Sequence, residues 1–322
     1  MSAISIEHED RADTAPPARR PIGGARARGG SAHRRMGWIL AGPAVLLLLS
    51  LTVFPAVYLI YSSLFDFRLL DETKAFVGLD NYTFVLTDGT IRHDLLVTLL
   101  FVGLAVSIEM LAGLLLAIPL ARRTLSNSIA STLLLIPFAI TPAVSALVFR
   151  QLLDPNFGWI DYYLHQIGIM GEPVDWLASP TTAWIALVGL DVWQWTPFVA
   201  LILMAGLQGL PEEPRQAAAL DGATRWQQLR YITLPQLAPF IAIALLLRIV
   251  EAFKTFGTVQ ILTGGGPGRS TEIVNLTIYR TALQDFSIGA AAALGMVFLL
   301  LLSLIVPQIL RLVTRGDVVE GS

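Results

Sequence analysis

Six long apolar runs determine what this 322-residue chain can fold into. A helix needs about 20 mostly apolar residues to cross the hydrocarbon core of a bilayer, and each run reaches that length. Only 14% of the residues are charged, whereas a soluble domain carries about 25%. The sequence therefore predicts an all-α, polytopic membrane protein with six transmembrane helices. The expected spans cover residues 38–62, 95–120, 129–152, 181–207, 240–262 and 288–310.

The charges of the loops predict how these spans are oriented. Arginine collects before the first span, after the second at Arg122 and Arg123, and after the sixth at Arg311 and Arg315. Acidic residues predominate after the first and third spans. Because loops rich in Arg and Lys stay in the cytoplasm, we expect both termini to be cytoplasmic. The apolar run of the first span is longer than that of a signal peptide, which indicates an uncleaved helix.

The connection between the fourth and fifth spans, about residues 208–236, is longer than neighbouring spans require. Gln216–Leu220 are strong helix formers, and Asp221-Gly222 is expected to end that helix because glycine adopts positive φ without a Cβ clash. A second short helix is expected from Ala223 or Thr224 until Pro235. The two helices form a protrusion that either lies on lipid headgroups or docks to a cytoplasmic partner.

The residues of this protrusion resemble the signature loop of the membrane-spanning permease subunits of bacterial ATP-binding-cassette (ABC) importers. In that family the loop forms a coupling helix that sits in a cleft of the ATPase subunit. Gln216 stands where the family usually has Glu, which removes one charged contact from the expected interface. The resemblance implies that the ATPase-docking residues are Gln216, Ala217, Ala218, Asp221, Gly222 and Ala223.

Two further segments resemble the carbohydrate-type permeases of this family, which include those for maltose and glycerol phosphate. They are Phe76–Tyr82, after the first span, and Leu262–Pro267, after the fifth. The resemblance implies a type I ABC importer transmembrane fold and import of a sugar or sugar-like solute across a bacterial cytoplasmic membrane. It also implies three partners besides the lipid bilayer: ABC ATPase subunits, a second homologous permease and an external solute-binding protein.

The expected organisation has four parts. They are a disordered basic tail (1–36), a first transmembrane helix with its external loop (37–93), a permease domain of five helices (94–310) and a cytoplasmic C-terminal tail (311–322).

Several kinds of chemistry are missing from the sequence. There is no cysteine, and neither Lys74 nor Lys254 stands in a G-x-x-x-x-G-K-[ST] motif for binding nucleotide phosphates. The four histidines lack metal-ligand spacing, and no nucleophile–base pair is recognisable. A net charge of −2 argues against nucleic acid as a partner. We therefore expect no catalytic residue, metal or cofactor in this chain, with ATP and magnesium bound by the partner ATPase subunits.

Charged residues inside predicted spans are functional candidates because they are expensive to insert. Arg248, Glu251 and Lys254 follow one another at spacings of three, so they share one face of a helix. They either form an ion-pair ladder inside the bundle or line a hydrophilic path for the substrate. Glu109, in the second span, is a candidate partner for one of the two cations.

The fourth span carries a second polar group, Asp191, Trp193, Gln194 and Trp195. Carboxylates, amides and aromatic faces suit sugar binding, so these residues, with Glu251 and Lys254, are the predicted substrate path. Packing and hydrogen bonding between helices is the alternative role. For the whole protein, an ion-coupled secondary transporter that uses Glu109, Asp191 or Glu251 remains the alternative, while a membrane-embedded enzyme lacks a recognisable reaction centre.

Overall fold

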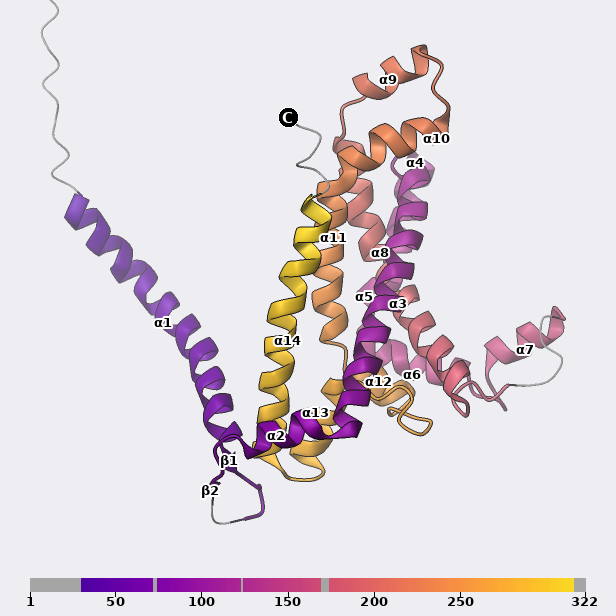
Figure 1. Cartoon of the computed structure of the whole chain (residues 1–322). Helices are drawn as coiled ribbons and strands as arrows, with labels where there is room; N and C mark the ends of the chain where they lie inside the picture. Colours follow the sequence, from indigo (N-terminus) through magenta and orange to yellow (C-terminus); the bar gives the residue numbers. More distant parts are fainter. Residues whose placement is uncertain (1–29, 72–73, 123, 169–173, 316–322) are drawn as a thin grey trace, which may run out of the picture. The chain divides into compact units, whose positions relative to one another are not determined.

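The computed structural model describes residues 30–71, 74–122, 124–168 and 174–315 (Figure 1). The chain divides into two compact units, Met1–Pro55 and Ala56–Ser322. The described elements are α1 (Gly30–Ser63), β1 (Phe65–Asp66), β2 (Ala75–Phe76), α2 (Asp80–Thr87), α3 (Gly89–Leu120), α4 (Leu125–Leu134), α5 (Ile136–Ala139), α6 (Pro142–Leu152), α7 (Trp159–Gln166), α8 (Pro180–Gly209), α9 (Glu213–Leu220), α10 (Arg225–Gln228), the π-helix η1 (Leu229–Thr233), α11 (Leu234–Phe253), α12 (Gly257–Leu262), α13 (Val274–Leu283) and α14 (Ile288–Arg315).

The first unit contains most of α1. The apolar stretch Ala41–Ser63 of α1 is long enough to cross a membrane, in agreement with the expected first span. The helix begins at Gly30, so it includes the last residues of the expected basic tail 1–36. The rest of that tail, residues 1–29, and the end of the C-terminal tail, 316–322, lie outside the described residues.

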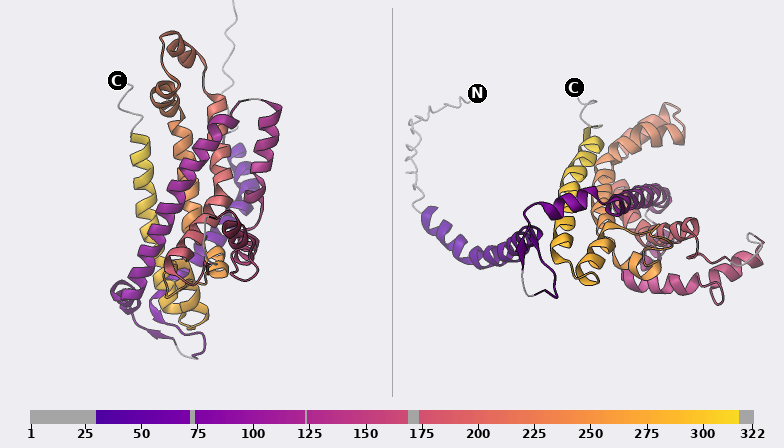
Figure 2. Two further views of the ribbon diagram at one scale, coloured as in Figure 1. Left: turned by 90° about the vertical axis from the view of Figure 1, so that its right-hand side faces the viewer. Right: turned by 60° about the horizontal axis from the view of Figure 1, so that its bottom comes forward.

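The second unit is a helix bundle with α3, α8 and α11 at its centre. Each of these three helices packs against the other two, and α14 packs along α11 (Figures 1 and 2). The core between them is built from aliphatic and aromatic side chains such as Phe101, Leu187, Leu190 and Leu294. Around one end of the bundle, α2 and α13 pack against α14, and α6 packs against α12. β1 and β2 form a short antiparallel hairpin that pairs Phe65 with Phe76.

The apolar helices of the structure agree with most of the expected spans. Among the described residues, five helices are long and apolar enough to cross a membrane: Ala41–Ser63, Gly89–Leu120, Pro180–Gly209, Arg225–Phe253 and Ile288–Gln308. A sixth span results if the bent pair Leu125–Ala139 and Pro142–Leu152 counts as one. The six predicted spans therefore correspond to five such helices and one bent pair.

The expected third span, 129–152, is not a continuous helix. Its two parts meet at an angle of 91°. Ile140 and Thr141 are extended, with ψ of 137° and 141°, and they directly precede Pro142. Proline disfavours helical conformation in the residue before it, so the break falls at this point of the sequence.

The expected fifth span, 240–262, has different boundaries in the structure. Its helix is already in progress at Arg225, because α10, η1 and α11 run on without interruption, and it ends at Phe253. The expectation that Pro235 ends the second short helix is thus wrong. The N–H of Leu234 bonds to the carbonyl of Leu229 in a wide π-helical turn, and this turn lets the helix continue past a proline that lacks an N–H.

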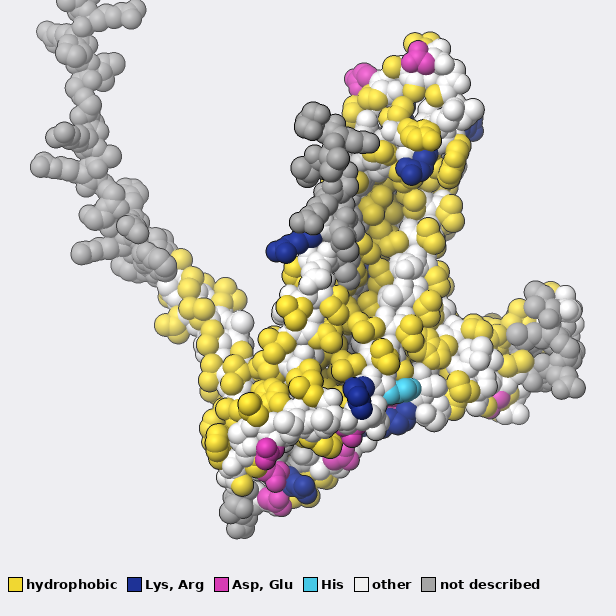
Figure 3. Space-filling view, viewed as in Figure 1, with side chains coloured by type: hydrophobic (Ala, Val, Ile, Leu, Met, Phe, Trp, Pro, Cys, Tyr) yellow, Lys and Arg dark blue, Asp and Glu magenta, His cyan; other side chains and the backbone are white. Residues whose placement is uncertain are grey.

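The two ends of the second unit carry most of its charge. On the face shown in Figure 3, charged side chains gather near the ends, and hydrophobic side chains cover the helices between them. One end holds α9, α10 and the C-terminal part of α14; the other holds α2, α12 and α13 (Figure 1). This pattern is that of a bundle whose middle lies in hydrocarbon.

Candidate functional site

The elbow between α9 and α10 is built by a specific C-terminal cap. The N–H of Ala223 bonds to the carbonyl of Ala218 at 2.9 Å, and the N–H of Gly222 bonds to that of Ala219 at 3.2 Å. This pair of bonds is the Schellman motif, which requires a residue with positive φ at the position that Gly222 occupies. Gly222 has φ of +85°, so the expected glycine elbow is confirmed.

A capping box starts the second helix immediately after the elbow. The Thr224 hydroxyl accepts a hydrogen bond from the N–H of Gln227 at 3.3 Å, and the Gln227 side chain accepts one from the N–H of Thr224 at 2.8 Å. Gln228 donates to the carbonyl of Ala223 at 3.0 Å. The Schellman motif and the capping box together hold α9 at a defined angle to the long helix that α10 begins.

The protrusion exposes several apolar and aromatic side chains. Leu220, at the tip of α9, is 90% exposed, and Trp226 and Tyr231 are also largely exposed. Beside the elbow lies a shallow hollow of about 340 Å³. All six predicted docking residues lie on this protrusion, and four of them, Gln216, Ala217, Asp221 and Gly222, are exposed. The predicted docking residues did not include Leu220, whose exposure becomes visible only in the structure.

A buried group of charged residues joins the three central helices. Arg248 of α11 is fully buried and donates to Glu109 of α3, with its Nη2 atom 2.9 Å from Oε1, and also to Asp191 of α8. Both carboxylates are buried as well. The Cζ atom of Arg248 lies 4.7 Å from the ring centroid of Trp195, in cation–π geometry. Glu109 is therefore the partner of Arg248, as the sequence suggested.

Gln194 has a structural role at the break of the third span. Its side-chain nitrogen donates to the carbonyl of Ile140 at 2.8 Å, which is one of the backbone groups that the break between α5 and α6 leaves without a helical partner. Irregular backbone within a membrane bundle is tolerated where a neighbouring helix satisfies such groups. Trp193, in contrast, is 39% exposed, and its ring lies 5.1 Å from that of Phe149.

Glu251 and Lys254 are accessible to solvent, whereas Arg248 is buried. Their side chains are 38% and 62% exposed, and they pair with each other, with the Lys254 nitrogen 2.7 Å from Glu251 Oε1. They lie where α11 ends, and Asn275 of α13 donates to the free carbonyls of Phe253 and Thr255 at 2.8 and 2.9 Å. The three residues that share a spacing of three therefore form two groups, one buried and one accessible.

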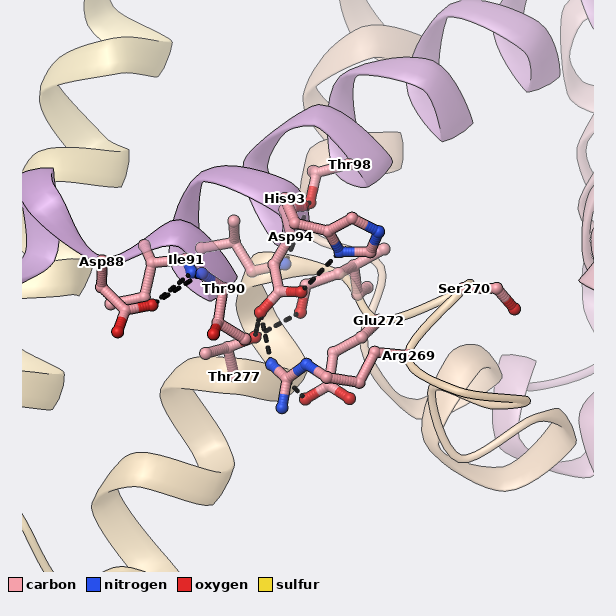
Figure 4. Close-up of polar contacts among 12 residues, drawn as sticks. Asp88, Thr90, Ile91, His93, Asp94, Thr98, Arg269, Ser270, Glu272 and Thr277 are labelled. Carbon is pink, nitrogen blue, oxygen red and sulfur yellow. Dashed lines mark hydrogen bonds and ion pairs between the residues drawn. The ribbon is translucent and has the colours of Figure 1, made fainter.

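A second polar cluster (Figure 4) lies at the end of the bundle that holds α2, α12 and α13, opposite the elbow (Figure 1). Asp94, buried near the start of α3, accepts hydrogen bonds from Arg269 at 2.6 Å and Thr277 at 2.7 Å, and His93 lies 3.2 Å away. The hydroxyl of Thr98 accepts from the N–H of Val274 at 2.9 Å, which satisfies the first turn of α13. These contacts attach the loop after α12 to α3.

Glu272 holds the same loop from its other side. It is buried, and it pairs with Arg280 and, at 3.3 Å, with Arg269. Burial raises the pKa of the Glu272 carboxyl, against the opposing effect of these two arginines. Arg280 also donates to the carbonyl of Gly264 at 2.6 Å. Sequence reasoning missed this cluster, although a carboxylate next to a long apolar run, as at Asp94, is a signal for a buried ion pair.

The fold and these features define a class of protein: a membrane-embedded chain with several apolar spans, a buried charged group in its centre and a helical protrusion at one end. Residues 109–316 match the family described as binding-protein-dependent transport system inner membrane component, and the chain belongs to this family. Among the described residues, no group of three or more His, Asp or Glu is placed to hold a metal ion.

Curated relatives agree with this family. The chain is 34% identical to the trehalose/maltose transport system permease protein MalF of Thermococcus litoralis, over 84% of this chain and 90% of that protein. It is 33% identical to the trehalose transport system permease protein SugA of Mycobacterium tuberculosis, over 82% and 84% of the two chains. These findings give no support to the ion-coupled secondary transporter.

The fold is also that of a solved importer. A chain of a bacterial alginate ABC transporter, solved in complex with an alginate pentasaccharide-bound periplasmic protein, has a TM-score of 0.76 with this chain at 21% identity. The match covers 90% of this chain and 98% of the other. The expected type I ABC importer transmembrane fold is confirmed.

Proposed function

We propose that this chain is the permease subunit of an ABC importer that carries a sugar or sugar-like solute across a bacterial cytoplasmic membrane. The family supports the transport role, and the names of the curated relatives, which refer to trehalose and maltose, support the substrate class. The chain itself performs no catalysis in this proposal. ATP and magnesium are bound by separate ATPase subunits.

The observation that carries the proposal is the elbow at Gly222, which projects Leu220 into solvent. In the proposed complex, α9 sits in a cleft of an ATPase subunit, and the Schellman motif and capping box transmit its displacement to the long helix that begins at α10. The elbow lies at the same end of the bundle as the C-terminal part of α14 (Figure 1). This placement supports a cytoplasmic elbow on the same side as the end of α14.

The solute-binding protein and the second permease contact surfaces of the chain other than the elbow. We assign a solute-binding protein to the end of the bundle that holds α2, α12 and α13, opposite the elbow (Figure 1). The alginate transporter solved with a periplasmic protein supports a partner of this kind. A second homologous permease completes the translocation path. The polar residues at the centre of this bundle, around Arg248, are buried by its own helices, so the path runs between two such bundles.

The substrate path of the proposal uses the predicted residues in two ways. Trp193, Glu251 and Lys254 have accessible side chains and line the path. Asp191, Gln194 and Trp195 support it from behind, because they contact Arg248 or the broken helix. Replacing Lys254 with Gln should raise the KM for transport severalfold while the basal ATPase rate of the complex stays unchanged. An unchanged KM removes Lys254 from the path.

The coupling role is tested by replacing Gly222 with Leu. A Cβ atom at Gly222 meets no atom within 4 Å, but the φ of +85° strains any side-chain-bearing residue, at about 1–2 kcal/mol. We expect solute uptake and the stimulation of ATP hydrolysis by the loaded binding protein to fall at least tenfold, with normal amounts of the chain in the membrane. Gly209→Leu is the matched control, because Gly209 is also free of neighbours within 4 Å and has no positive φ.

Two results would overturn the proposal. Normal uptake in Gly222→Leu would show that the elbow does not couple ATP hydrolysis to transport. Uptake that continues in vesicles without ATP, and instead follows an ion gradient, would show that the chain is not part of an ATP-driven importer.

A further inference from the structure

A second and larger hollow lies between the protrusion and the bundle. Its volume is about 870 Å³, within the usual range of ligand sites. Its walls come from the ends of α3 and α8, from α9 and from α10 with η1. The transport roles proposed above assign no function to this hollow.

The charge of the hollow is strongly positive. Three separate segments contribute Arg122, Arg215 and Arg225, and the only acidic side chain of the lining is Glu212. Glu212 accepts a hydrogen bond from Gln216 at 3.3 Å. Within the described part of the chain, no hydrogen bond or ion pair joins these three guanidinium groups to another residue, and Arg215 Nε is buried without a partner. A buried donor without an acceptor is costly, so the site is suited to an anion.

The hollow also has an apolar wall that continues toward the hydrocarbon layer. Ile118 of α3 and Leu207 of α8 line it, and both lie inside candidate membrane spans, close to the ends at Leu120 and Gly209. Trp226 and Leu229 line the other side. A cationic recess above such a wall matches an amphiphile whose headgroup is anionic and whose chains enter the bilayer.

We propose that this hollow binds the phosphate headgroup of an anionic phospholipid from the adjacent leaflet. Basic recesses between membrane helices bind such headgroups through Arg and Lys, and the planar guanidinium group matches phosphate oxygens in a bidentate geometry. A free phosphate ion offers the same oxygens, but it makes no use of the apolar wall. Because the hollow contacts both α9 and the ends of α3 and α8, a bound lipid connects the elbow to the bundle.

The test measures lipid retention by native mass spectrometry of the purified full-length chain with its co-purifying subunits. Phosphatidylglycerol is added in equal amount with phosphatidylcholine, and the variants are Arg122→Gln, Arg215→Gln and Arg225→Gln, alone and combined. We expect the affinity for phosphatidylglycerol to fall about fivefold for each charge removed, and about 100-fold in the triple variant. Phosphatidylcholine binding should not change.

Arg230→Gln is the matched control, because Arg230 belongs to the same protrusion but does not line the hollow. It should retain phosphatidylglycerol like the unmodified chain. Arg122 lies outside the protrusion, so the effect of Arg122→Gln is independent of ATPase docking. Equal retention in all variants would overturn the proposal, and so would an equal loss in Arg230→Gln. Displacement of phosphatidylglycerol by 10 mM inorganic phosphate would assign the site to the free ion.

Discussion

At the residue scale, Arg248 is the side chain on which the buried charged group depends. Among the described residues, it is the one cation paired with the two buried carboxylates Glu109 and Asp191. Removing one partner of a buried ion pair destabilises a protein by about 3–5 kcal/mol, because the remaining charge has no compensation. We expect Arg248→Met to reduce the amount of folded chain in the membrane and to lower its melting temperature in detergent.

The same group offers a rescue experiment. Combining Arg248→Met with Glu109→Gln and Asp191→Asn leaves no unpaired charge and should recover most of the lost stability. Lys254→Met is the comparison on the same helix, and its exposed pair with Glu251 should contribute less than about 1 kcal/mol. If the triple variant is no more stable than Arg248→Met, the charged group does not act as a balanced unit.

Gly113 tests how closely α3 and α8 pack. A Cβ atom there would lie 2.6 Å from Val199 Cγ1, whereas one at Gly103 of the same helix meets nothing within 4 Å. Gly113→Ala should therefore destabilise the bundle by about 1–3 kcal/mol, while Gly103→Ala should be neutral or stabilising. Thermal unfolding of the two purified variants decides between them, and equal melting temperatures would contradict this packing.

At the element scale, Asp88 determines how α3 begins. Its side chain accepts hydrogen bonds from the N–H groups of Ile91 at 3.0 Å and Thr90 at 2.8 Å. These bonds, chiefly the one from Ile91, lower the pKa of Asp88 below its usual value. A carboxyl with a lowered pKa stabilises the folded state fully above the unfolded pKa, about 4, and loses this effect as the pH falls through the folded pKa.

Asp88→Ala should cost about 1 kcal/mol at neutral pH, measured as a lower melting temperature. The difference from the unmodified chain should shrink as the pH falls below about 4. Asp88→Asn retains an acceptor that does not titrate, so it should keep most of the stability at both pH values. A pH-independent difference for Asp88→Ala would show that the cap does not act through its charge.

The positions of the helices could be predicted from the sequence, but the contacts that stabilise the breaks and ends of the helices could not. Long apolar runs indicated the spans because burial of the backbone in hydrocarbon favours helices of that length. The break at Thr141 depends on Gln194 from another helix, and the end of α11 at Phe253 depends on Asn275. Such compensating contacts join residues far apart in sequence, so periodicity within one segment does not reveal them.

The candidate site could also be predicted only in part. Gly222 was recognised because a Schellman motif is local and needs glycine at one position. The grouping of Arg248, Glu251 and Lys254 was only partly right, since the helix ends near Lys254 and the packing of α3 and α8 buries Arg248 alone. The cluster around Asp94 and Arg269 involves residues 175 positions apart, which no local pattern brings together.

At the scale of the whole molecule, polar groups connect the two ends of the bundle. The elbow lies at one end, the charged group of Arg248 joins the central helices, and the cluster of Asp94 and Glu272 holds the loop at the other end. α3 contributes to both polar groups and α11 runs from the elbow to Arg248. In the proposed complex, these helices would carry a displacement of α9 toward the end assigned to the solute-binding protein.

The central claim is that α9 docks to an ATPase, and site-specific cross-linking tests it most directly. The chain contains no cysteine, so Leu220→Cys introduces a single attachment point for a photoreactive maleimide at the tip of α9. Phe157→Cys is the control, because Phe157 is 77% exposed and lies between α6 and α7, away from the elbow. The measurement is mass-spectrometric identification of the adducts formed in native membranes. We predict an adduct with a nucleotide-binding ATPase from Leu220→Cys and none from Phe157→Cys; the absence of an ATPase adduct at position 220, or equal adducts at both positions, would contradict the account.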